Sequence, residues 1–186
     1  MDMLEVIYAR RSVRAYAQTP VDRSLIEELL ACAVQAPTGM NTQPWAFGVV
    51  QGSETLRAYA DRAKKMLLEM FGEADWFARY KQRVEQPDYS VFHNAPALVA
   101  IYAKSAASGA KTDCCLAAEN LMLSACAKGL GTCWIGFSTA FFQASETKKE
   151  LGVPEDCEIV APIVLGYAAG PAPAVEKGPP EVLFWK

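Results

Sequence analysis

Two short segments carry side chains that could bind a phosphate-bearing ligand. The first, Arg-Arg-Ser-Val-Arg at residues 10–14, brings three guanidinium groups and a hydroxyl within five positions. Such groups hold a dianionic phosphate through bidentate, charge-assisted hydrogen bonds. A solvated basic face is the simpler interpretation. It is weakened because Val13, Ala15 and Tyr16 continue the segment as an extended, partly buried stretch.

The second segment is Pro-Thr-Gly-Met-Asn-Thr-Gln-Pro-Trp at residues 37–45. Asn41 and Gln43 each offer a donor and an acceptor, which suits the edge of a heterocycle such as a flavin or a pyrimidine. Taken alone, the segment is more simply interpreted as a capping turn before a core tryptophan.

The sequence lacks the residue patterns that metal binding, Ser or Cys hydrolysis and dinucleotide binding require. A protein-bound metal is disfavoured because His93 is the single histidine and no Cys-x-x-Cys or His-Glu-x-x-His pattern occurs. His93 could serve a Ser or Cys hydrolase as its base, but there is no Gly-x-Ser-x-Gly elbow, and a loop position before a strand explains it more simply. The glycines at 129–131 follow a helix, and Gly136 comes too late for a dinucleotide fingerprint.

Hydrophobic periodicity predicts the elements that position these segments. Helices are expected over 1–9, 22–36, 56–70, 76–84, 113–128 and 144–151, and strands over 45–50, 95–103, 132–137 and 158–168. Asp22 is expected to cap the second helix and Pro37 to end it. Because residues 113–128 are apolar on nearly every side, we expect that helix to be buried against its own core and a partner subunit.

Length and composition fit one domain over residues 1–186. The formal charge of −3 argues against nucleic-acid binding, and no apolar stretch reaches the roughly 18 residues of a membrane span. The N-terminus lacks a signal-peptide pattern. We therefore expect reduced thiols in a cytoplasmic protein at the six cysteines, Cys32, Cys114, Cys115, Cys126, Cys133 and Cys157.

The C-terminus indicates a homodimer. Residues 170–180 hold four prolines, which predicts an extended arm over 170–186. The arm ends on the apolar tip Val-Leu-Phe-Trp at 182–185, which needs a docking surface. Hydrophobic residues also make up 52% of the chain, slightly more than is usual for a domain of this kind.

Four motifs in this order and spacing resemble the nitroreductase family of FMN-dependent oxidoreductases. They are the arginine segment 10–14, the loop 37–45, the helix from Asp113 that leads into Gly-Leu-Gly-Thr-Cys-Trp-Ile-Gly at 129–136, and a Gly-Tyr before a proline-rich tail with a basic residue. The resemblance implies an α+β fold with a central mixed β-sheet flanked by helices. It also implies an intertwined homodimer with C-terminal arm exchange and two FMN molecules at the interface.

The resemblance implies thirteen cofactor-binding residues: Arg10, Arg11, Ser12, Arg14, Pro37, Thr38, Gly39, Asn41, Gln43, Trp134, Ile135, Gly136 and Lys177. The arginine segment would hold the phosphate, the ribityl chain and the flavin O2 edge, and the loop would come from the other subunit. The backbone at 135–136 would donate to flavin N5 and O4. Lys177 stands where the family usually places an arginine on the phosphate, and it lacks the bidentate fork.

The implied activity is hydride transfer from NADH or NADPH through flavin N5 to an electron-poor small molecule, such as a nitroaromatic or a quinone, in ping-pong order. Arg14 would stabilise the reduced, anionic flavin, and no catalytic side chain is assigned. Residues 55–95 are expected to set specificity. Two alternatives stay open: a non-enzymatic FMN storage or sensor protein, and another flavin chemistry such as dehalogenation or flavin fragmentation.

Overall fold

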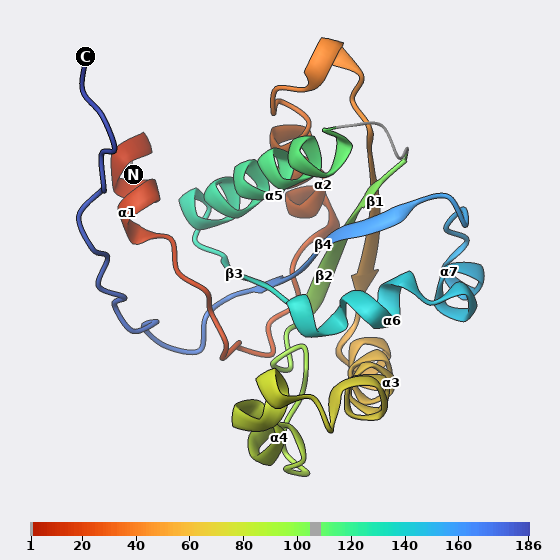
Figure 1. Cartoon of the computed structure of the whole chain (residues 1–186). Helices are drawn as coiled ribbons and strands as arrows, with labels where there is room; N and C mark the ends of the chain where they lie inside the picture. Colours follow the sequence, from red (N-terminus) through yellow and green to blue (C-terminus); the bar gives the residue numbers. More distant parts are fainter. Residues whose placement is uncertain (1, 105–108) are drawn as a thin grey trace.

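The computed structural model describes residues 2–104 and 109–186 and contains a four-stranded sheet with helices on both faces (Figure 1). In the order β1-β2-β4-β3, the strands are Trp45–Gln51, Ala97–Ala103, Glu158–Gly166 and Gly131–Trp134. The α+β prediction is confirmed. All three strand pairs are antiparallel, and the parallel component of the expected mixed sheet is the single bridge between Ser12 and Thr132.

The central strand β2 is buried along its whole length because both faces of the sheet are covered. Side chains alternate between the faces of a strand. Val99 and Ile101 therefore pack toward α2 (Arg23–Ala33) and α5 (Ala110–Ala127), whereas Leu98 and Tyr102 pack toward α3 (Ser53–Phe71) and α6 (Thr139–Gln143). The strand is consequently apolar at every position.

The remaining helices are α1 (Met3–Ala9), α4 (Ala78–Val84) and α7 (Ser145–Leu151), with short 3-10 turns at Gly39–Asn41, Asp75–Phe77 and Gly136–Ser138. Asp2 and Glu5 form a reciprocal capping box that starts α1. Gly129, at φ +77°, ends α5 in a left-handed turn that Leu130 N–H closes on the Ala125 carbonyl at 2.8 Å. This turn leads the chain directly into β3.

Several expected boundaries are wrong. The α5 helix begins at Ala110, so Asp113 lies in its first turn, and Asp22 occupies the N-cap of α2 without a side-chain capping bond. Strand β3 ends at Trp134 because a turn starts at Gly136 and the Ser138 hydroxyl donates to the Ile135 carbonyl at 2.9 Å. The short α6 helix, which lies between the expected strand over 132–137 and the expected helix over 144–151, was not predicted.

Parts of the chain leave large apolar side chains uncovered. On α1, Met3, Leu4, Ile7 and Tyr8 are exposed, and on α5, expected to be buried all round, Leu116 is exposed. The arm runs as an extended trace away from the sheet on the side of α1 (Figure 1), with Trp185 92% exposed at its tip. No helix in the described part of the chain is both long enough and apolar enough to span a membrane.

Candidate functional site

A cleft of about 580 Å³ opens at the end of the sheet where β3 finishes. Its walls come from the arginine segment, from α4 and the loop after it, and from the end of β3: Arg14, Tyr80, Arg83, Tyr89, Ser90, Val91, His93, Cys133, Trp134, Ile135, Gly136 and Phe137. The volume lies within the range of small-molecule and cofactor sites, roughly 300–1,000 Å³. Four of the thirteen predicted residues, Arg14, Trp134, Ile135 and Gly136, therefore share one space.

The arginine segment is held in place by β3. Ser12 bridges Thr132, and Val13 N–H donates to the Thr132 carbonyl at 2.9 Å. The buried Tyr16 hydroxyl donates back to the Val13 carbonyl at 2.8 Å. With Val13 and Tyr16 turned into the core, Arg14 is left at the cleft.

Arg10 and Arg11 line a neighbouring groove of about 240 Å³ between α1, β3 and the start of the arm. Arg11 donates from Nη1 to the Tyr8 carbonyl at 2.6 Å and so also closes the end of α1. Arg10 lies 3.5 Å from the Glu119 carboxylate. The guanidinium groups predicted to act together are thus divided between two adjoining hollows.

The Gly136 backbone faces open space. A Cβ added there would meet no atom within 4 Å, and the amide is the first of a 3-10 turn, where N–H groups have no intrahelical partner. The described part of the chain offers the Gly136 N–H no backbone acceptor. A flat ring could therefore approach this amide closely.

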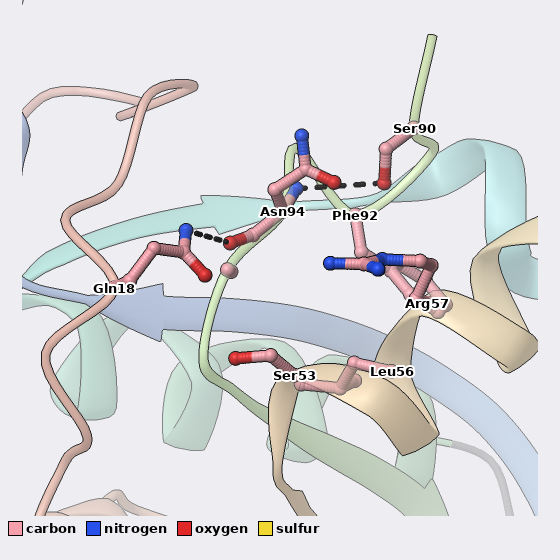
Figure 2. A pocket seen from close by; sticks show the side chains of 8 residues that line it. Gln18, Ser53, Leu56, Arg57, Ser90, Phe92 and Asn94 are labelled. Carbon is pink, nitrogen blue, oxygen red and sulfur yellow. Dashed lines mark hydrogen bonds between the residues drawn. The ribbon is translucent and has the colours of Figure 1, made fainter. Parts of the chain in front are cut away.

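A loop before β2 carries His93 into the cleft. His93 and Asn94 both have φ +53°, an uncommon left-handed conformation for residues with side chains. Figure 2 shows two of the bonds that hold it: Asn94 N–H donates to Ser90 Oγ at 3.4 Å, and Gln18 Nε2 donates to the Asn94 carbonyl at 3.3 Å. The hollow that these residues surround measures about 10 Å³, room for about one water. The hydrogen bonds around this hollow hold the loop in place, and the hollow itself is too small for a ligand.

The cleft is electropositive. Burial, and then the charges of Arg14 and Arg83, lowers the pKa of His93 to about 4, so the imidazole is neutral at pH 7. Burial raises the pKa of the Cys133 thiol, against the lowering effects of Arg14 and Ser12. Arg14, His93 and Cys133 all line this cleft.

Sequence reasoning missed the wall formed by Tyr80, Arg83, Tyr89 and His93, although it placed specificity in residues 55–95. The spacing of Tyr80 and Arg83 on an expected helix was the available signal. The helix is fixed there by Phe77, which is fully buried and stacks edge-on against Phe137 with ring centroids 5.8 Å apart.

The predicted loop 37–43 lies at the opposite end of the sheet (Figure 1). The backbone N–H of Lys104, just after β2, donates to the Pro44 carbonyl at 2.7 Å, whereas His93 precedes the other end of that strand. The seven residues of β2 span roughly 20 Å. One chain therefore does not bring the loop and Arg14 to the same ligand.

Within the loop, the predicted residues contact one another and α5. Gly39 N–H donates to the buried Asp113 carboxylate at 3.2 Å, and Gln43 Nε2 donates to Asn41 Oδ1 at 3.1 Å. Gln43 N–H also donates to Thr38 Oγ1 at 3.3 Å, and Pro37 is exposed before the turn. Lys177 lies apart from both groups, exposed on the arm.

Comparison with known proteins identifies the family. The model of the nitroreductase family matches residues 7–167, so the chain belongs to that family. A protein of Archaeoglobus fulgidus named "Putative NADH dehydrogenase/NAD(P)H nitroreductase" is 30% identical over 171 residues, which cover 89% of this chain and 85% of that protein. A 4-nitrobenzoate reductase of Pseudomonas putida is 29% identical, with coverage of 90% and 86%.

Solved structures agree with the fold. A nitroreductase from Bacteroides fragilis with bound FMN has a TM-score of 0.83 at 29% identity and covers 100% of this chain and 98% of its own. Another FMN-bound nitroreductase, from Desulfitobacterium hafniense, has a TM-score of 0.84 at 24% identity and covers 100% of each chain. The predicted family and fold are confirmed.

Proposed function

We propose that this protein is an FMN-dependent oxidoreductase that transfers hydride from NADH or NADPH to an electron-poor acceptor, such as a nitroaromatic or a quinone, in ping-pong order. The observation that carries the proposal is the cleft in which Arg14 and the Gly136 backbone line one space. Family membership and the FMN bound in two structural relatives support it. An NAD(P)H donor and six free cysteines favour the cytoplasm.

The residues of the cleft fit FMN in size, charge and shape. The open space over Gly136 admits a flat ring, and Arg14 supplies a positive charge beside it. Arg10 and Arg11 in the adjoining groove offer guanidinium groups to a phosphate.

When bound, FMN supplies hydride acceptance and donation at its N5 position. Arg14 would hold a positive charge beside the ring edge that becomes negative on reduction, and a preorganised charge in a partly dry site stabilises that state. The Gly136 amide would fix the position of the ring. Neutral His93 would orient a ligand by hydrogen bonding without adding charge.

We further propose that two chains complete each site. The loop 37–43 and Arg14 lie at opposite ends of β2, so the loop would reach the flavin of a partner subunit in a homodimer. The uncovered apolar side chains of α1 and of the arm supply surface for such an interface, with Lys177 carried on the exchanged arm.

The decisive experiment starts with the absorbance spectrum and the cofactor released on denaturation. We expect FMN and not FAD, and rapid bleaching of the bound flavin by NADH or NADPH without oxygen. Arg14→Gln should weaken FMN binding by about 2 kcal/mol, as expected for loss of a charge-assisted contact, whereas the exposed Arg23→Gln should leave it unchanged.

Each of the other outcomes would indicate a different function. A flavin that NAD(P)H fails to bleach would indicate the storage or sensor alternative. Bleaching followed by dehalogenation or by flavin breakdown, detected in the products with and without air, would indicate another reaction on this fold. Absence of FMN from the purified, FMN-supplemented protein would overturn the proposal.

A further inference from the structure

The outer wall of the cleft combines aromatic rings with a guanidinium group that the proposed cofactor chemistry does not use. Tyr80 and Arg83 are three residues apart on α4 and therefore share one side of that helix. The Tyr80 ring meets Phe137 edge-on, with centroids 5.3 Å apart. Arg83 Cζ lies 5.7 Å from the centre of the Tyr89 ring.

Arg83 keeps part of its hydrogen-bonding capacity unused. Both carboxylate oxygens of Asp88 contact the same nitrogen, Nη1, at 3.1 and 3.2 Å. For Nε and Nη2, the described part of the chain provides no acceptor. An exposed pair of this kind contributes little stability. Asp88 therefore orients the guanidinium and leaves Nε and Nη2, a pair of donors that can bind a carboxylate, available.

The charge around the cleft differs in sign from that of the protein. The whole chain has a formal charge of −3. The cleft, by contrast, is lined by two arginines, and no carboxylate of residues 2–104 and 109–186 lines it. If Arg14 serves the flavin, Arg83, whose Nη1 pairs with Asp88, still has Nε and Nη2 without an acceptor among the described residues. A second anionic group beside the aromatic wall would satisfy it.

We infer that Tyr80, Arg83, Tyr89 and Phe137 form the acceptor subsite, and that this subsite selects aromatic acceptors that carry a carboxylate. The inference rests on the proposed function and names its substrate class. The acceptor ring would pack against Tyr80 and Phe137, for which edge-to-face contacts are favourable. Its carboxylate would pair with the Arg83 fork.

Binding tests the inference independently of turnover. Benzoate and benzamide have the same ring and nearly the same shape and differ in charge. Calorimetry on the FMN-loaded protein should give benzoate a Kd at least about tenfold lower, the effect of one charge-assisted pair. Arg83→Gln should abolish this preference and Arg83→Lys should retain part of it. Arg23→Gln, which also breaks an exposed ion pair, should leave it intact. Equal affinities in the unaltered protein would overturn the inference.

Kinetics decide whether Arg83 contacts the acceptor or the phosphates of the donor, because each half-reaction of a ping-pong enzyme has its own kcat/KM. Arg83→Gln should lower kcat/KM for 4-nitrobenzoate about tenfold and leave 4-nitrobenzamide and NAD(P)H unchanged. A loss confined to NAD(P)H, or equal for both acceptors, would overturn the inference. Failure to reduce either acceptor would refute the proposed function alone, since the benzoate binding preference would still stand.

Discussion

Replacing Gly131 with alanine is expected to displace the arginine segment through one steric contact. A Cβ at this position would lie 2.5 Å from Val13 Cγ2, 2.8 Å from Val13 Cβ and 2.9 Å from Val13 Cγ1. Rotation of the Val13 side chain cannot relieve the contact with its own Cβ. The backbone that carries Arg14 must therefore move away from β3.

The magnitude follows from the packing. Forcing extra atoms into a close-packed core costs about 1–3 kcal/mol, and the reduced freedom of the unfolded chain returns about 0.4–1 kcal/mol of it. We expect Gly131→Ala to lower the free energy of unfolding by about 1–2 kcal/mol. The matched control is Gly48→Ala in β1, where a Cβ would make ordinary contacts of 3.8 and 3.9 Å and should be tolerated.

The assay is urea unfolding followed by circular dichroism, at fixed protein concentration and saturating FMN, because both dimer and cofactor binding change the apparent stability. FMN affinity, measured by flavin fluorescence, should fall in the same variant. Val13→Ala removes two of the three close contacts, so the double variant should be more stable than additivity predicts by about 0.5 kcal/mol or more. If Gly131→Ala matches Gly48→Ala in stability and in FMN affinity, the steric reasoning is wrong.

Three further predictions concern other parts of the site. Deleting residues 181–186 should weaken the dimer and FMN retention together, and a monomer by light scattering that still holds FMN stoichiometrically would contradict this coupling. Asp113→Ala removes the acceptor of Gly39 N–H and should reduce FMN affinity several-fold, although the position of Arg14 stays the same. An unchanged FMN affinity in fluorescence titrations would show that the loop does not need this hydrogen bond. In the cofactor-free protein, NMR titration of His93, the single histidine, should give a pKa of about 4. Since the unfolded chain takes up this proton at its ordinary pKa of about 6.5, stability should fall as the pH drops from 6.5 toward 4. His93→Asn, which tolerates φ +53°, should flatten that dependence, and an unaltered slope would exclude His93 as its source.

Local sequence determined most of the secondary structure. Strand β2 is an uninterrupted apolar run, α2 has apolar residues at helical spacing, and Gly129 marks a helix end, so each could be predicted from short-range physics. The failures lie between Ile135 and Gln143, where the Ser138 hydroxyl and the packing of Phe141 and Phe142 set the turn and α6. The Ser138 bond is local, but Phe142 packs against Phe92, with ring centroids 6.1 Å apart, and that contact joins residues distant in sequence.

The site divides in the same way. The sequence by itself predicted the arginine segment and the amide-bearing loop, because each is a contiguous pattern of residues with its own chemistry, whereas the backbone at Ile135–Gly136 was predicted only through the family resemblance. It could not place the loop at the far end of β2 from Arg14, nor bring Arg83 and His93 into the cleft. Arg83 is placed by the packing of Phe77, just before α4, onto Phe137, and His93 by the bond from Asn94 N–H to Ser90. The loop 37–43 is held instead by the bond from Gly39 N–H to Asp113. Non-local packing fixes such positions, so only the tertiary structure decided which charges share one space.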